Sequence, residues 1–118
     1  MDVNNLTKRI KIFIGESDRV SGKLLYEEIV ERAREAGMAG ATVYRGIMSF
    51  GASHSIHTMK IFALSGDLPV LIEIVDNVEV IEAFIPGLQQ LMDESGKGGL
   101  VYTENVNVIR YETGDKYK

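Results

Sequence analysis

Strand, helix and strand patterns follow one another twice along this chain, and that order constrains its fold more than any other feature. In the first half, isoleucines alternate with other residues over 9–14, which is the period of a strand with one buried face. Residues 21–36 carry apolar side chains at helical spacing, with Ser21 as the expected N-cap and Gly37 just beyond the helix end. An extended stretch over 41–50 completes this first unit.

The second half repeats the order. The nearly continuous apolar run at 70–75 predicts a central strand, and Asp76 or Asn77 can cap the helix that follows. Pro86 lies inside the helical pattern and is expected to kink or split it. The expected inner face of this helix consists of Val80, Ile81, Phe84, Leu88 and Leu91. Strands at about 99–103 and 106–111 are expected to close the fold.

This order predicts an α+β fold of the ferredoxin-like type, a βαββαβ sandwich. Its four-stranded antiparallel sheet would carry two helices on one face, with a short extra C-terminal strand. Residues 1–118 are expected to form a single domain with its core at about 8–112. Two helices cannot cover both sheet faces, and the apolar residues that the sheet is expected to present include Ile10, Ile12, Ile72 and Ile74. A symmetric oligomer that packs sheet faces together is therefore predicted.

Composition argues against several classes of protein. The chain has no cysteine, which excludes disulfides, thiol catalysis and cysteine-ligated metals. A net charge of -4 argues against nucleic acid as a partner. No apolar run approaches the roughly 18 residues that span a membrane, and the first residues lack a signal-peptide pattern, so no membrane insertion and a cytoplasmic location are expected. No pattern combines a nucleophile, a base and an oxyanion site, so no catalytic residue is predicted and the protein is not expected to be an enzyme.

The segment Gly96-Lys97-Gly98-Gly99 lies between the second predicted helix and the next strand. Glycine lets backbone N–H groups approach an anion closely, and lysine adds a positive charge. Arg110, at the end of the last extended run, could offer a bidentate fork to phosphate. Together these residues indicate a ligand that carries phosphate. A segment of this kind is more often a turn that binds nothing, and that alternative stays open.

Two further groups of polar residues allow more than one interpretation. His54 and His57 are the only histidines, and two ligands are fewer than a zinc site needs, so no metal site is predicted. The other interpretations are that His54 is a solvated loop residue, and that His57 either forms a structural hydrogen bond or lies at the rim of a binding cleft. Glu16, Asp18 and Arg19 could orient a ligand at the end of the first strand, or they form only a turn and a helix start.

Several segments resemble the PII signalling proteins of the GlnB-like superfamily. The resemblance rests on residues 37–43 at a helix-to-strand joint, Ser49-Phe50-Gly51 at the T-loop base, 72–75 in the third strand, Gly96-Lys97-Gly98 in the B-loop, and 108–114 in a strand ending like Arg-x-Arg-Thr-Gly. A closer resemblance is to a PII-like family otherwise known only as a domain of unknown function. Its typical segments are matched at 13–17, 49–52, 56–58 and 67–70. The likeness covers about residues 8–114.

The resemblance implies a PII-like homotrimer with clefts between its subunits, each able to hold an adenine nucleotide. The nucleotide-binding positions that it implies are Thr42, Ser49, Phe50, Gly51, Gly96, Lys97, Gly98, Gly99 and Arg110, with His57 as a possible contact from the loop. Residues 51–69 correspond to the T-loop, through which such proteins signal to a target protein. No obligatory cofactor is implied; ADP, AMP or ATP would be the ligand.

Three positions depart from the PII pattern. Glu112 stands where the second arginine of Arg-x-Arg is expected, Gly99 where a lysine follows the B-loop glycines, and Ala52 where an arginine follows Gly-Phe-Gly. Each lost charge-assisted contact is worth about 1.5–3 kcal/mol. Triphosphate affinity should therefore fall most, and ADP or AMP is expected to bind as well as ATP or better. The 51–69 loop has no tyrosine that could be modified.

The predicted function is that of a nucleotide-sensing regulatory protein that signals through the 51–69 loop. Two alternatives remain. One is a trimeric metal-binding module of the CutA type, which only His54 and His57 support. The other is a slow nucleotide hydrolase that would use a loop carboxylate.

Overall fold

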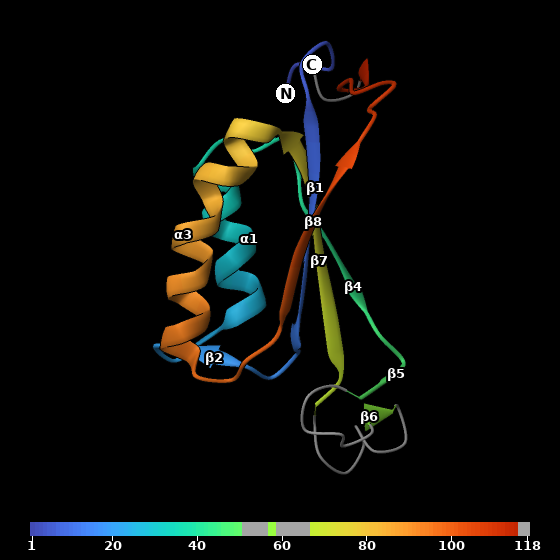
Figure 1. Ribbon diagram of the computed structural model, residues 1–118. Coiled ribbons are helices and arrows are strands. Elements are labelled where there is room, and N and C mark those ends of the chain that lie inside the picture. The colour runs from blue at the N-terminus through green and yellow to red at the C-terminus, as the bar shows by residue number, and fades with distance from the viewer. Residues whose placement is uncertain (51–56, 59–66, 116–118) are drawn as a thin grey trace.

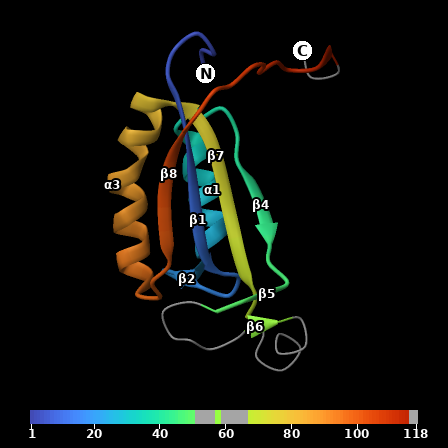
Figure 2. The same cartoon turned by 45° about the vertical axis from the view of Figure 1, so that its right-hand side comes forward.

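The computed structural model describes residues 1–50, 57–58 and 67–115. A four-stranded antiparallel sheet forms its centre. Its strands are β1 (Thr7–Gly15), β4 (Thr42–Arg45), β7 (Pro69–Asn77) and β8 (Leu100–Val106), in the order β4-β7-β1-β8. Helices α1 (Leu25–Glu35) and α3 (Val78–Ser95) lie side by side against one face of this sheet (Figure 1, Figure 2). The predicted ferredoxin-like α+β fold is confirmed.

The two central strands pair over their whole length. β1 and β7 run antiparallel in register from Thr7 opposite Asn77 to Gly15 opposite Pro69. Both strands alternate between buried and half-buried residues, because successive side chains point to opposite faces of a sheet. The predictions of a strand at 9–14 and of a central strand at 70–75 are confirmed.

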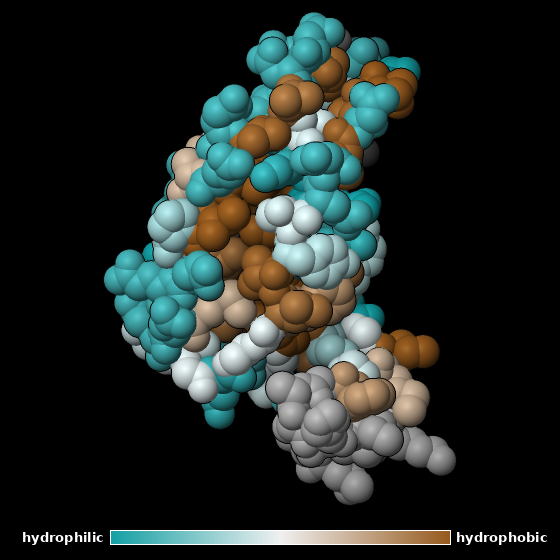
Figure 3. Space-filling model, viewed as in Figure 1, coloured by the Kyte–Doolittle hydropathy of each residue, from teal (hydrophilic) through white to brown (hydrophobic). Residues whose placement is uncertain are grey.

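The core lies between the sheet and the two helices. Its buried residues come from all four central elements and include Ile10, Ile12, Ile14, Leu25, Ile29, Val70, Ile72, Ile74, Ile81, Leu88 and Leu91. Burying one such side chain contributes roughly 1.5–3 kcal/mol. Ile85 and Met92 of α3 and Val101 of β8 pack against the core while partly exposed, and Figure 3 shows apolar surface between α3 and β8.

The expectation that Ile10, Ile12, Ile72 and Ile74 lie on an uncovered sheet face is wrong. All four are at most 1% exposed and belong to the core that the helices cover. The uncovered face carries the intervening residues of each strand, because the side-chain period of a strand is two. One face of the sheet therefore does lack a helical cover, as predicted, but with different residues on it.

This uncovered face, called the open face below, is aromatic at one end. Phe13 of β1 lies opposite Leu71 of β7 and Leu100 of β8, and residues directly opposite on neighbouring strands share a face. The rings of Phe13 and Tyr102 stack with their centroids 5.9 Å apart. Tyr44 of β4, opposite Leu71, is 50% exposed. Apolar surface thus reaches across all four strands of the sheet.

Helix α1 begins later than its sequence pattern predicts. A hairpin of β2 (Arg19–Val20) and β3 (Lys23–Leu24) precedes it, and the turn residues Ser21 and Gly22 have φ of 50° and 79°. A two-residue hairpin turn favours positive φ, so Ser21 lies in this turn and the prediction that it caps the helix is wrong. The helix end is as predicted, since Met38 N–H donates to the Ala33 carbonyl at 3.1 Å across Gly37.

Helix α3 continues unbroken through Pro86, so of the predicted kink or split the split does not occur. Proline has no N–H, so the carbonyl of Glu82 loses its helical hydrogen bond. Pro86 and Glu82 are both exposed, and water can therefore hydrogen-bond to that carbonyl. Asn77 is the N-cap residue, as expected, although its side chain makes no capping hydrogen bond. Val80, expected on the inner face, is 37% exposed.

The chain leaves the sheet after Val106. Thr7, the first residue of β1, lies opposite Val106, so β1 offers no further residue for the chain to pair with. In the described part of the C-terminal segment, 107–115, no strand forms, and the predictions of a strand at 106–111 and of a short extra strand are wrong. The tail instead contacts the connection before β4, where Tyr111 Oη donates to the Ala39 carbonyl at 2.7 Å. Among the described residues no helix is long and apolar enough to cross a membrane.

Candidate functional site

The predicted nucleotide-binding residues lie at separate places on the sheet. Thr42 begins the edge strand β4, midway along the sheet and opposite Glu73. Ser49 and Phe50 follow the far end of that strand. Residues 96–99, the glycine loop, lead into the other edge strand, β8, and Arg110 lies beyond the end of β8. Gly51 lies outside the described residues, as does His54.

The glycine loop has a conformation that the path of the chain requires. Gly96 ends α3 with φ of 67°, and its N–H donates to the carbonyls of Met92 and Asp93. Gly99 has φ of 154°, and a Cβ there would lie 2.6 Å from the Phe13 carbonyl oxygen. The fold therefore needs these glycines with or without a ligand. Lys97, between them, is exposed and can reach a ligand.

Ser49 and His57 are brought together. β5 (Met48–Ser49) pairs with β6 (His57–Thr58), and Ser49 lies directly opposite His57. The side chain of Phe50 is 66% exposed. Two of the predicted contacts from the base of the 51–69 loop therefore meet at one end of the sheet.

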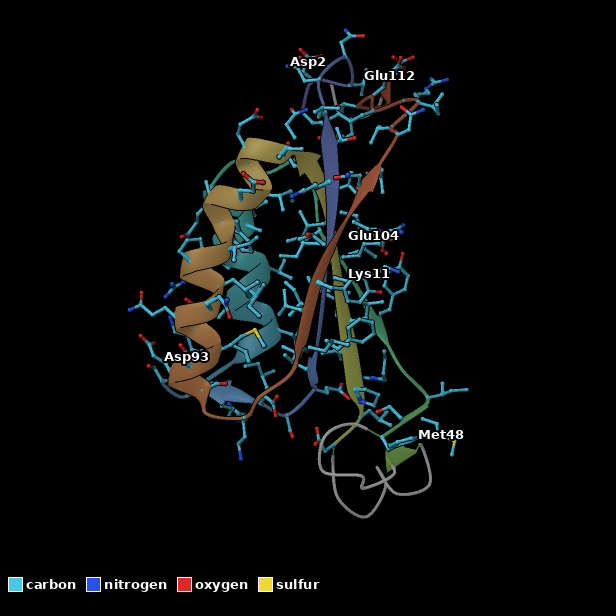
Figure 4. All side chains as sticks on the ribbon, viewed as in Figure 1. Asp2, Lys11, Met48, Asp93, Glu104 and Glu112 are labelled. Atoms are coloured by element: carbon cyan, nitrogen blue, oxygen red, sulfur yellow. The ribbon has the colours of Figure 1, made fainter. Side chains whose placement is uncertain are left out.

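Arg110 lies at the opposite end of the sheet from the glycine loop. The seven residues of β8 separate the two, which is about 20 Å of strand. Figure 4 shows Glu112 near one end of the molecule and Asp93, in the last turn of α3 before the glycine loop, toward the other end. The Arg110 guanidinium pairs with Glu112 at 2.9 Å, so the acid that replaces an expected arginine contacts the arginine that remains.

A cluster of polar side chains, called the sheet-end cluster below, lies beside the glycine loop where β1 ends. Gly15 N–H donates to Asp18 Oδ2 at 2.9 Å, and Ser17 Oγ donates to Asp67 Oδ1 at 3.1 Å. Burial raises the pKa of Asp18; the hydrogen bond from Gly15 and the charge of Lys97 oppose this shift, and the charge of Asp67 adds to it. Lys97 of the glycine loop is thus electrostatically coupled to the cluster.

Sequence reasoning singled out Glu16, Asp18 and Arg19 but missed Asp67 and Arg45. Arg45, at the end of β4, forms an ion pair with Glu16. Asp67 is followed by Leu68, and the Leu68 carbonyl accepts a hydrogen bond from Glu16 N–H at 2.7 Å. The signal that could have located Asp67 is the antiparallel pairing of β1 with β7, which places the residues before β7 beside those after β1.

Two surface hollows lie elsewhere on the molecule. One is lined by residues of the β2–β3 hairpin and α1, the other by residues of α1 and α3, and neither includes a predicted nucleotide-binding residue. Within 1–50, 57–58 and 67–115, no group of three or more His, Cys, Asp or Glu side chains could hold a metal ion. One chain therefore presents separated parts of the predicted nucleotide site.

Comparison with protein families places the chain among uncharacterized proteins. Residues 7–108 match the family DUF190, described as "Uncharacterized ACR". A UPF0166 protein from Aquifex aeolicus is 39% identical over 103 residues, covering 86% of this chain and 92% of the relative. A UPF0166 protein from Methanocaldococcus jannaschii is 36% identical over 106 residues, covering 90% of this chain and 94% of the relative. The names of these two relatives state no activity.

Solved structures with the same fold include PII-like proteins. CPII from Thiomonas intermedia K12, a nitrogen regulatory PII-like protein bound to ADP, AMP and bicarbonate, aligns with a TM-score of 0.68 at 17% identity, covering 89% of this chain and 90% of that one. The divalent ion tolerance protein CutA1 from Ehrlichia chaffeensis aligns with a TM-score of 0.56 at 11% identity, covering 96% and 89%. At these identities the likeness shows the fold alone, and that fold is PII-like.

Proposed function

The chain belongs to the DUF190 family, and from this membership and its PII-like fold we propose that it is a nucleotide-sensing regulatory protein. It binds an adenine nucleotide between neighbouring copies of itself in a homotrimer. The proposed contacts are Thr42, Ser49, Phe50, Gly51, the glycine loop and Arg110, with His57 from the loop. The binding of ADP and AMP by CPII, a protein of the same fold, supports the choice of ligand.

The observation that carries this proposal is the separation of the glycine loop from Arg110 by the length of β8. A phosphate cannot contact both within one chain, because the strand between them is about 20 Å long. A ring of copies joined head to tail places one end of each chain against the other end of its neighbour. In such a ring the glycine loop of one copy and Arg110 of the next complete one site.

The open face supports the assembly. It exposes Leu100 by 56% and Tyr44 by 50%, and no helix in the described part of the chain covers it. Burial of apolar surface is worth about 25 cal/mol per Å², so packing this face against other copies favours association. The helices then remain on the outside of the assembly.

The contacts of Arg110 favour a ligand with fewer phosphates than ATP. Glu112 pairs with the Arg110 guanidinium and places a negative charge beside it. A triphosphate would meet this carboxylate and would lack the cations that PII proteins place at the positions of Gly99 and Ala52. ADP or AMP is therefore the expected physiological ligand.

Signalling passes through the 51–69 loop. The base of this loop is the β5–β6 pair, where Ser49 lies opposite His57. A nucleotide that contacts this pair favours one arrangement of the loop, and the target protein reads that arrangement. A ligand can shift such an equilibrium only through contacts that differ between the two states.

The proposal is tested by complementation between two defective chains. Lys97→Glu places a negative charge in the glycine loop, and Arg110→Glu places one at the other half-site. Each variant alone should lose ADP binding in calorimetry. When the two are unfolded together and refolded as mixed trimers, about a quarter of the sites should contain neither substitution and bind ADP again.

The control is a mixture in which every chain carries both substitutions, which should stay inactive. Failure of the mixed trimers to bind ADP, with each parent still folded, would mean that the two residues do not share a site between copies. Binding of ADP by a protein that sediments as a monomer would equally overturn the composite site.

The two alternative functions rest on fewer residues. The CutA-type interpretation depends on His54, which lies outside the described residues, and on His57. A slow hydrolase is distinguished from a sensor by incubating the protein with ATP and magnesium and measuring whether ADP and phosphate form. A sensor without hydrolase activity leaves the added ATP intact.

A further inference from the structure

A surface groove runs between α1 and α3 on the helical side of the molecule. Its volume is about 470 Å³, and it is lined by Arg32, Ala36, Met38, Glu79, Val80, Ala83, Phe84, Gly87, Leu88 and Leu91. Seven of these ten residues have apolar side chains, and only Arg32 and Glu79 carry a charge. Along α3 the groove extends from Val80 to Leu91, which is about 16 Å at the rise of a helix. Three turns of another helix have the same length.

Gly87 lies in the middle of this groove, and no contact among the described residues requires a glycine there. A Cβ at Gly87 would meet no atom within 4 Å. Glycine in a helix interior costs about 1 kcal/mol relative to alanine. Helix α3 therefore carries a destabilising residue whose missing side chain leaves open space along an apolar groove.

The helices around the groove are strongly acidic. Together α1 and α3 contain eight acidic and two basic residues, although the whole chain has a net charge of only -4. Both basic residues are already paired, Arg32 with Glu28 at 3.3 Å and Arg34 with Glu31 at 3.5 Å. Lys8 pairs with Glu82 at 3.1 Å.

Several carboxylates of these helices remain without a cation. Five acidic residues of α1 and α3 form no ion pair with any described residue: Glu27, Glu35, Glu79, Asp93 and Glu94. Figure 4 labels Asp93 at the lower end of α3, and Figure 3 shows this end of the helix as hydrophilic surface. Glu79 lines the groove itself, and the other four lie elsewhere on the same two helices, so the helical side of the molecule carries uncompensated negative charge.

We propose that this groove docks a basic amphipathic helix of a partner protein. The apolar face of that helix lies in the groove with one large side chain over Gly87, and its lysines or arginines face the carboxylates of α1 and α3. Such a helix binds through apolar anchors spaced by three or four residues. The complementary charges speed the encounter and select the partner.

A second copy of this chain does not fit the groove. Two such faces would bring two sets of uncompensated carboxylates together, and like charges at an interface are strongly unfavourable. The open face has no such repulsion, since its charged residues Arg9, Lys11, Glu73 and Glu104 balance one another. The open face therefore serves self-association, and the groove stays available for a different protein.

The test uses a synthetic amphipathic peptide of about 18 residues, five helical turns. Leucines occupy one face and lysines the other, and a second peptide carries glutamates in place of the lysines. Fluorescence anisotropy in about 0.15 M salt measures binding to the full chain. The lysine peptide should bind and the glutamate peptide should not.

Variants distinguish the groove from general charge attraction. Gly87→Glu fills the groove while adding a negative charge, and Gly87→Gln fills it without adding charge. Gln89→Glu adds the same charge on α3 outside the groove. Both Gly87 variants should bind the lysine peptide about tenfold or more weakly, and Gln89→Glu should bind it as the unchanged chain does.

Equal or tighter binding by Gly87→Glu would show attraction by charge alone and would overturn the proposal. Absence of binding by the unchanged chain, or binding of the glutamate peptide with equal affinity, would also overturn it. The inference does not depend on the nucleotide site, because none of its residues is a predicted nucleotide contact.

Discussion

Arg9 and Glu104 form an ion pair across the open face of the sheet, with Nη2 and Oε1 2.9 Å apart. Arg9 also approaches Glu73 at 3.6 Å, and Lys11 approaches Glu104 at 3.9 Å. The hydrogen bond to Glu104 is the main reason that the pKa of Arg9 lies above its usual range. These charges are neutralised within the chain, so the open face can meet another copy without a charge left unpaired. In the proposed trimer, the aromatic end of the face, around Phe13, determines how tightly the copies associate.

Phe13→Glu should disrupt self-association without unfolding the chain. Phe13 stacks on Tyr102 in the middle of the apolar end of the open face, and a carboxylate there would be desolvated between copies. The loss should be at least about 2 kcal/mol per interface, as for a central aromatic contact. Sedimentation velocity and circular dichroism measure the two properties. Val80→Glu, on the helical side, is the matched control, and equal behaviour of both variants would exclude the open face as the interface.

Arg110→Ala should weaken ADP binding by about 1.5–3 kcal/mol, the worth of a hydrogen bond to a charged group, and leave the trimer intact. The matched control is Arg34→Ala, because Arg34 is equally exposed and paired with an acid but lies on α1. Calorimetry with ADP and with ATP measures the change. Equal affinities for the two variants would mean that Arg110 does not contact the nucleotide.

Asp76→Ala should destabilise the fold. Asp76 is 2% exposed, and its carboxylate accepts hydrogen bonds from Ala39 N–H at 2.8 Å and Asn77 N–H at 2.7 Å. Removing it leaves buried donors without partners, at a cost of about 1–3 kcal/mol each. Urea denaturation measures the loss. Asp93→Ala on the surface should change stability by less than about 0.5 kcal/mol, and a similar loss in both variants would contradict the structural role of Asp76.

Asp18→Asn should change how stability depends on pH. Burial raises the pKa of Asp18, so the folded chain binds its proton more tightly than the unfolded chain does. The stability from this group is present below the unfolded pKa and is lost as pH rises through the folded pKa. Asparagine keeps an acceptor for Gly15 N–H but does not titrate. The urea midpoint of the variant should therefore rise relative to that of the original chain as the pH increases from about 3 to about 7. A constant difference over that range would argue against the raised pKa.

Nucleotide should slow amide hydrogen exchange at the base of the 51–69 loop. The β5–β6 pair has only two residues in each strand, so few hydrogen bonds hold it without a ligand. Peptides that cover 48–60 should gain more protection on addition of ADP than peptides from α1. Equal protection with and without saturating ADP would leave a nucleotide-binding protein without signalling through this loop.

Local patterns in the sequence determined the elements that local physics controls. The alternation around Ile12 predicted the strand and which of its residues share a face, because successive side chains of a strand point to opposite faces. It did not predict that the helices cover the isoleucine face. The end of α1 at Gly37 could be predicted because glycine adopts the left-handed conformation at a helix end without steric cost. Ser21 misled the prediction because serine suits both a helix cap and a turn, and the following Gly22 favoured the turn.

The tertiary structure alone decided which distant residues meet. Asp67 contacts Ser17 across 50 positions, and Tyr111 contacts Ala39 across 72, through strand pairings and chain paths that no local period specifies. The same pairings end β8 at Val106 and so hold Arg110 far from the glycine loop that the sequence had grouped with it. Hydrophobic periodicity indicates which residues of a helix or strand share a buried side, because it depends only on positions close in sequence. Register between strands depends on the packing of the whole sheet and becomes visible only in the folded chain.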